Sequence, residues 1–237
     1  GLKKFNEECK NSVFTYENAW VNLTERIGFW VDMDNPYITL KNDYIESVWW
    51  SLQQAWKKKL LYKGHKVVPY CPRCGTALSA HEVAQGYKTV KDPSIFVKFK
   101  LKNENTYFLA WTTTPWTLLS NVALAVNPDE LYIKVRYRGE ELILAEQRAA
   151  SLLKGENYDL IDGFKGKELE HTEYEPLFPF AKPEKKAWYI ICADFVTMDD
   201  GTGIVHIAPA FGEDDYNIGK VYDLPVVQLV NLDGTFK

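Results

Sequence analysis

The sequence predicts an α+β protein, mainly β, in which a barrel-like domain with peripheral helices follows a helical segment. Three observations support this. Apolar residues recur at helical spacing before residue 65, they alternate in short runs after residue 92, and the 237 residues are 46% hydrophobic and 25% charged, as in ordinary globular proteins. Many short strands with few helices between them favour a barrel-like sheet over a doubly wound one. We divide the chain into a helical segment (1–65), a cysteine-bearing connector (66–91) and a mainly β domain (92–237).

The helical segment shows its period most clearly over residues 45–60, where six apolar residues fall on one face. Lysines at 57–59 lie near the end of this stretch, where cations suit the helix dipole, and Gly64 follows as a stop signal. An earlier stretch, 16–30, has similar spacing, and Gly28 interrupts it near its end. We therefore expect two helices before residue 65.

Period-two alternation begins after Pro93, where Ile95, Val97, Phe99 and Leu101 lie on one face of a predicted strand. Further strands are expected at 107–113, 122–126, 131–137, 142–145, 188–196 and 203–208. Short helices are expected at 147–153, ended by Gly155, and at 214–222, and a hairpin around Asp233-Gly234 is expected at 226–236.

Composition and charge exclude several classes of protein. The formal charge of −4 disfavours a protein that holds nucleic acid on a broad basic surface. No apolar run is long enough to cross a bilayer, and the polar first ten residues contain no secretory signal, so we expect a cytoplasmic protein with no membrane partner. With only four cysteines, metal binding or plain thiols are favoured over disulfides.

The densest polar cluster consists of Thr112, Thr113 and Thr114, followed by a proline and flanked by two tryptophans. Hydroxyl groups donate and accept hydrogen bonds, so this cluster can hold a water molecule or a substrate oxygen. The plainer alternative is an edge strand, because threonine favours β structure.

A second cluster runs from Asp199 to Asp215, with glycines that permit tight turns and His206 on a predicted strand. A single histidine there is more often a packed core residue than a catalyst. The acidic residues 213–215 can cap a helix, which is their usual role. A carboxylate is a weak base at neutral pH, and it is better suited to holding a substrate ammonium group.

Cys71 and Cys74 have the C-x-x-C spacing of a zinc knuckle, with His81 the nearby additional candidate. Because a structural zinc ion takes four ligands, these residues form half of a site, and we expect it to be empty or partly occupied. The sequence contains neither a phosphate-binding glycine loop nor a nucleophile elbow, so it supports neither ATP binding nor covalent acyl-enzyme chemistry.

Taken together, the clusters resemble the isoleucyl-tRNA synthetases. WTTTPWTLLSN (111–121) and GTGIVHIAPAFGEDD (201–215) are similar to the two editing motifs of that family. The related leucine and valine enzymes have Thr-Thr-Arg-Pro where this chain has Thr-Thr-Pro, which favours the isoleucine family. TERIGFWVDMDNPY (24–37) and ESVWW (46–50) resemble the catalytic domain before the editing insertion, and PYCPRCGTALS (69–79) resembles half of the zinc-binding connector.

The resemblance implies a role for each site residue. Asp215 would hold the substrate's ammonium group, and His206 would help to judge side-chain size. Thr112, Thr113 and Thr114 would surround the ester and the attacking water, while Trp116 and Asn121 would shape the pocket or hold the terminal adenosine. Editing would need no cofactor; zinc is a candidate at the incomplete cysteine site, and ATP and magnesium would belong to an aminoacylation site whose signatures this chain lacks.

The implied function is hydrolysis of valine from mischarged tRNA(Ile), since a pocket gains only about 1–3 kcal/mol from one methylene and cannot exclude valine by binding alone. The implied partners are tRNA(Ile), its valyl ester and the remaining synthetase domains. One alternative is a tRNA-docking or interaction fragment without hydrolytic activity of its own. A further alternative is a zinc-ribbon nucleic-acid binder that depends on Cys71 and Cys74.

Overall fold

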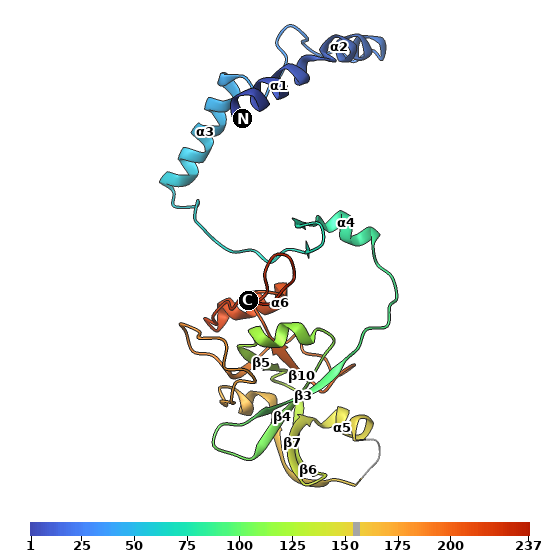
Figure 1. The fold of residues 1–237 in the computed structure, drawn as a ribbon, viewed down its shortest axis with the longest axis vertical. Helices are drawn as coiled ribbons and strands as arrows, with labels where there is room; N and C mark the ends of the chain where they lie inside the picture. The colour runs from blue at the N-terminus through green and yellow to red at the C-terminus, as the bar shows by residue number, and fades with distance from the viewer. Residues whose placement is uncertain (154–156) are drawn as a thin grey trace. The chain divides into compact units, whose positions relative to one another are not determined.

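The computed structural model describes residues 1–153 and 157–237, and these form two compact units, Gly1–His65 and Lys66–Lys237. Unit 1 contains α1 (Leu2–Phe14), α2 (Glu17–Arg26) and α3 (Asn42–Lys57), all labelled in Figure 1. Helix α2 ends shortly before Gly28, which adopts φ 75°, a left-handed conformation that suits glycine. Helix α1 was not expected from the sequence.

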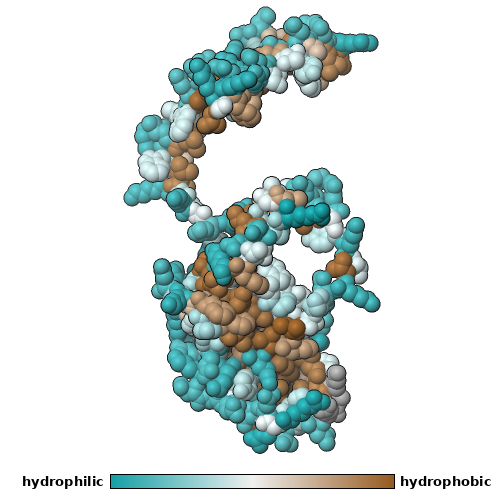
Figure 2. Space-filling view, in the orientation of Figure 1, coloured by the Kyte–Doolittle hydropathy of each residue, from teal (hydrophilic) through white to brown (hydrophobic). Residues whose placement is uncertain are grey.

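Unit 1 has no core of its own. None of residues 1–65, all of which the structure describes, is buried. Trp30 is 97% exposed, and Trp49, Trp50 and Trp56 of α3 are each about two-thirds exposed. Figure 2 shows further hydrophobic residues, in brown, at the surface of these helices. Helices of this kind gain most of their stability by burying an apolar face, so unit 1 needs a surface to pack against.

Unit 2 begins with a small hairpin and a short helix, and continues with two larger sheets. The hairpin is β1 (Tyr70–Cys71) with β2 (Thr76–Ala77), and it is followed by α4 (Ala80–Gln85). A capping box between Ser79 and Glu82 stabilises the start of α4. The next elements are β3 (Ile95–Lys100), β4 (Thr106–Thr112), η1 (Pro115–Ser120), β5 (Ala123–Val126), β6 (Leu131–Tyr137), β7 (Glu140–Ala145), α5 (Glu146–Leu152), β8 (Asp159–Lys165), η2 (Gly166–Leu169), β9 (Tyr189–Cys192), β10 (Ile204–Ile207) and α6 (Glu213–Val221).

The larger sheet has the strand order β3-β4-β7-β6-β8, and the smaller one has the order β10-β5-β9. Strands β4 and β7 run parallel, as do β5 and β9, and the other pairs within these sheets are antiparallel. The described strands form no single closed barrel, so the barrel-like shape is limited to two sheets packed together. The expected α+β class, mainly β, is confirmed.

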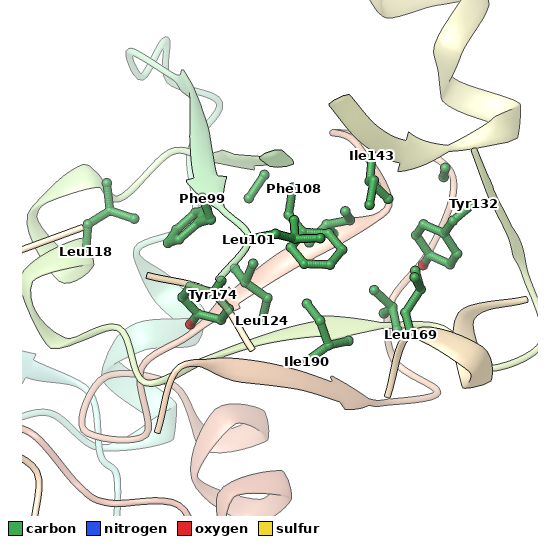
Figure 3. Close-up of a cluster of buried hydrophobic side chains, with 14 residues drawn as sticks. Phe99, Leu101, Phe108, Leu118, Leu124, Tyr132, Ile143, Leu169, Tyr174 and Ile190 are labelled. Carbon is green, nitrogen blue, oxygen red and sulfur yellow. The ribbon is translucent and has the colours of Figure 1, made fainter. Parts of the chain in front are cut away.

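The core lies between the two sheets. Phe99, Phe108 and Ile143 come from the larger sheet, and they pack with Leu124 and Ile190 of the smaller sheet, as drawn in Figure 3. Each is at most 2% exposed. Burying a side chain of this size stabilises a fold by about 1.5–3 kcal/mol, so this cluster fixes β5 and β9 against the larger sheet.

Three sequence expectations differ from the structure in detail. Strand β8 was not expected; most of its residues are exposed, so its sequence does not alternate. The strand expected at 188–196 is limited to β9, because Trp188 adopts a left-handed φ of 63° just before it. The hairpin expected at 226–236 is reduced to one bridge, Val230 with Phe236. Gly155, expected to end a helix, lies outside the described residues.

Candidate functional site

The threonine-rich segment lies where the chain leaves β4 and turns into η1. Thr112 is the last residue of β4 and is 7% exposed, and Pro115 begins η1, where a proline loses no backbone hydrogen bond. The backbone N–H of Thr114 donates to Thr112 Oγ1 at 3.0 Å. This contact sets the turn and brings the two hydroxyl groups together. Thr113, between them, is exposed.

A chain of hydroxyl groups continues from this turn to the second cluster. Thr112 Oγ1 lies 3.3 Å from Thr114 Oγ1, which lies 3.3 Å from Thr117 Oγ1, and Thr117 Oγ1 lies 3.0 Å from His206 Nε2. Thr117 was not among the residues predicted for the site. Its sequence signal is its spacing, three residues after Thr114 and therefore one helical turn away. The two predicted clusters are thus joined directly.

Strand pairing explains why they meet. Strand β5, which follows the threonine-rich segment, pairs with β10, and Leu124 lies opposite His206. The N–H of Val122 also donates to the carbonyl of Ile207 at 3.0 Å. Residues 89 apart in the sequence therefore become neighbours through the backbone alone.

His206 is neutral and held in one tautomer. Burial lowers the pKa of His206 to about 4, and the side chain is 8% exposed. Thr117 Oγ1 also lies 2.8 Å from the carbonyl of Thr114, which can accept its single hydroxyl proton, so we assign the proton in the contact with His206 to Nε2. Nδ1 is then a buried acceptor with no hydrogen-bond partner among the described residues. A neutral, fixed ring is suited to defining the shape of a pocket.

Asp215 lies in the first turn of α6 and folds back over the loop before it. Its Oδ2 accepts the N–H of Ala208 at 2.8 Å, two residues after His206. Burial raises the pKa of Asp215, and repulsion from Asp214 adds to the rise. A partly buried carboxylate of this kind gains stability when a cation approaches it. The glycine at position 212 leaves room for this position of the Asp215 side chain, since a Cβ on Gly212 would lie 2.9 Å from the Asp215 carboxyl carbon.

Trp116 and Asn121 have different surroundings. Trp116 is 47% exposed and packs edge-to-face on Phe211, with ring centroids 5.4 Å apart, so it joins the two clusters at the surface. Asn121 is buried, and its side chain is used within the fold: Nδ2 donates to the carbonyl of Ala123 at 2.8 Å, and Oδ1 accepts from the Tyr174 hydroxyl at 2.7 Å. Its contacts therefore stabilise the end of the threonine-rich segment.

The cysteine pair lies apart from these clusters in the β1–β2 hairpin. Gly75, with φ 68°, turns the chain, and the N–H of Cys74 donates to Cys71 Sγ at 3.4 Å. Among the described residues no group of three or more histidine, cysteine or acidic side chains is placed to hold a metal ion. The ring of His81 contacts Gln85 at 2.6 Å. Two thiols supply half of the ligands of a structural zinc ion, so the donor set is incomplete here and zinc binding stays a prediction.

Both joined clusters lie within a stretch of the sequence that matches the aminoacyl-tRNA synthetases. Residues 1–217 match the family model of tRNA synthetases class I (I, L, M and V), so the chain belongs to this family. Its particular resemblance is to the isoleucine enzymes. Over all 237 residues it is 62% identical to the isoleucine–tRNA ligases of Clostridium acetobutylicum and Clostridium novyi. The similarity to isoleucyl-tRNA synthetases is therefore confirmed.

The chain covers 23% of the length of each of these two relatives. Among solved structures, it resembles the crystal structure of GlLeuRS-CP1 with a TM-score of 0.47 and 22% identity, over 54% of this chain and 59% of that one. In the part of the chain that the structure describes, no helix is both long and apolar enough to cross a membrane.

Proposed function

We propose that this chain carries the editing site of an isoleucyl-tRNA synthetase, a cytoplasmic enzyme, and that the site hydrolyses the ester of Val-tRNA(Ile). The observation that supports this most strongly is the hydrogen-bonded path from Thr112 through Thr117 to His206. It brings two sequence clusters together that are each unremarkable alone. The parent enzyme would join isoleucine to tRNA with ATP and magnesium at a site outside this chain.

The threonines would position the attacking water. Thr112 Oγ1 already accepts the Thr114 N–H, and both hydroxyls can also donate. An aminoacyl ester is activated, so holding a water near it and stabilising the developing oxyanion supply much of the required catalysis. The water's proton would leave with the ribose oxygen as the ester bond breaks. No single threonine is assigned as the catalyst.

Asp215 would hold the substrate's ammonium group. Its pKa is raised by burial, and a bound cation would offset the cost of keeping this carboxylate charged. The ammonium group would fix the amino acid in one orientation. The carboxylate therefore would contribute to binding and orientation, with no role as a base.

His206 and Thr117 would form the wall that judges side-chain size. Thr117 is 4% exposed and His206 is 8% exposed, and the contact between them fixes both side chains. A rigid wall can admit valine and exclude isoleucine, whereas a mobile wall would adapt to either. This is the second sieve that the first binding step cannot supply.

Deacylation of Val-tRNA(Ile) and Ile-tRNA(Ile), measured for the chain and for its Asp215→Ala variant, tests the proposal. We expect fast loss of valine, slow loss of isoleucine and no activity above background in the variant. Asp214→Ala is the matched control, because Asp214 is the exposed neighbouring carboxylate, and it should retain activity.

The second candidate is a tRNA-docking or interaction fragment without hydrolytic activity of its own. It is favoured by unit 1, which has no buried residue and so depends on a further surface. Background hydrolysis by the chain, together with an Asp215-dependent loss of valine in the full-length enzyme, would favour this candidate. Background hydrolysis in both would refute the editing proposal.

A further inference from the structure

Two exposed phenylalanines lie on a loop whose two ends are held at the end of the threonine-rich segment. We define the proline loop as residues 175–187, which include Pro176, Pro179 and Pro183. Phe178 is 38% exposed and Phe180 is 65% exposed. Their rings are stacked, 9° from parallel, with centroids 6.0 Å apart. Isolated apolar residues are common on surfaces, but a parallel pair presents a flat platform.

The base of the proline loop is attached to the end of the threonine-rich segment. Tyr174 donates its hydroxyl proton to Asn121 Oδ1 at 2.7 Å, and Trp188 Nε1 donates to the Asn121 carbonyl at 3.2 Å. The N–H of Trp188 also donates to the carbonyl of Val122 at 2.6 Å. Both ends of the loop are therefore fixed at Asn121 and Val122. Three prolines further restrict its backbone, which lowers the entropy lost when it binds a partner.

Lysines follow the phenylalanines on the same loop. Lys182, Lys185 and Lys186 are exposed. Lys185 pairs with Asp223, and Lys186 lies 3.4 Å from Glu173 and 5.0 Å from the ring centroid of Tyr189. Exposed ion pairs contribute only about 0–1 kcal/mol, so a phosphate group can compete for these lysines.

Flat aromatic surfaces combined with lysines are the arrangement that binds unpaired nucleic-acid strands, in which bases stack on the rings and lysines meet the phosphates. We propose that Phe178, Phe180 and the loop lysines bind an unpaired RNA strand, with one base stacked on the exposed face of Phe180. This rests on the proposed function, whose substrate carries its ester on the unpaired 3′ end of a tRNA. The loop then guides that strand toward the threonines.

Fluorescence anisotropy tests the proposal, with the full chain and a labelled single-stranded RNA ending in CCA. The same strand in a blunt duplex is the control ligand. We expect the single strand to bind and the duplex to bind more weakly. Phe180→Ala should weaken binding of the single strand about tenfold, as loss of one stacked base predicts. Lys185→Gln with Lys186→Gln should reduce the slope of the logarithm of affinity against the logarithm of salt by about one to two.

Two control variants separate this proposal from the proposed function. Phe5→Ala removes a ring with the same 65% exposure from α1 and should leave binding unchanged. Asp215→Ala should abolish deacylation but bind the strand as the unaltered chain does. Equal binding by Phe180→Ala and Phe5→Ala would overturn the proposal whatever the deacylation assay gives. The proposal would also be overturned if the chain did not bind the RNA strand but formed a dimer that Phe180→Ala disrupts. The two rings would then form a contact between two copies of the chain.

Discussion

The buried, neutral state of His206 predicts how the stability of unit 2 depends on pH. An unfolded histidine has a pKa near 6.5, whereas the pKa of His206 in the fold is about 4. Between these values the unfolded chain binds more protons than the folded one, so stability is complete above pH 7 and falls as the pH drops toward 4. Between pH 7 and pH 5 this one group should lower the free energy of unfolding by about 2 kcal/mol.

Urea unfolding of the chain at both pH values measures this, alongside His206→Gln. Glutamine can still donate to Thr117 but carries no proton that titrates in this range. Carboxylates with shifted pKa values, such as Glu141 with a pKa of about 2 and Asp215 with a raised pKa, are present in both proteins, so their contributions cancel in the comparison. The unaltered chain should lose about 2 kcal/mol more than His206→Gln between pH 7 and pH 5. An equal loss in both would refute the reasoning. Nitrogen NMR of the His206 ring gives a second test that does not depend on the free energy of unfolding. Between pH 7 and pH 5 the ring should keep its proton on Nε2 and stay uncharged.

Three further predictions concern other parts of the chain. Thr117→Val should leave the Nε2–H of His206 and a backbone carbonyl unpaired, and urea unfolding should show a loss of about 2–6 kcal/mol that Thr117→Ser largely avoids. Similar losses in both would mean that the hydroxyl does not stabilise this contact. Gly212→Ala should displace the carboxyl group of Asp215 and abolish loss of valine from tRNA while the melting curve changes little, because the φ of −127° at Gly212 suits any residue. Limited proteolysis should cut residues 1–65 first, and the chain should self-associate through their exposed tryptophans in sedimentation experiments; a monomer with a resistant N-terminal segment would contradict this.

Most elements with a regular pattern could be predicted from the sequence. The alternation at 131–137 corresponds to β6, and the helical spacing around 45–60 corresponds to α3, although this helix ends at Lys57. Strand β8 and helix α1 were missed for different reasons. Most residues of β8 are exposed, so its sequence shows no alternation. Helix α1 does place Leu2, Phe5, Cys9 and Val13 at helical spacing, as α3 does with its own apolar residues, and this period was overlooked.

The candidate site was predicted as two separate clusters, and the structure adds what joins them. Nothing local in the sequence pairs Thr117 with His206, since their contact depends on the register between β5 and β10. Asn121 is the converse case, a residue that the sequence motif singles out and whose contacts lie within the fold. It lies within the threonine-rich motif, and its side-chain contacts with Ala123 and Tyr174 are internal. These contacts show how Asn121 stabilises the motif, and its role toward a substrate stays a prediction.

The contact between Thr117 and His206 also has a consequence for folding kinetics. It closes a loop of 89 residues, and the entropy lost on closing a loop grows with its length, so local interactions do not form this contact early. The strands β6, β7, β8 and β9 lie between its two halves in sequence. A chain in which β10 has not yet paired with β5 would have the threonines without His206 beside them. The selectivity that we propose for the site therefore depends on the long-range pairing of β5 with β10.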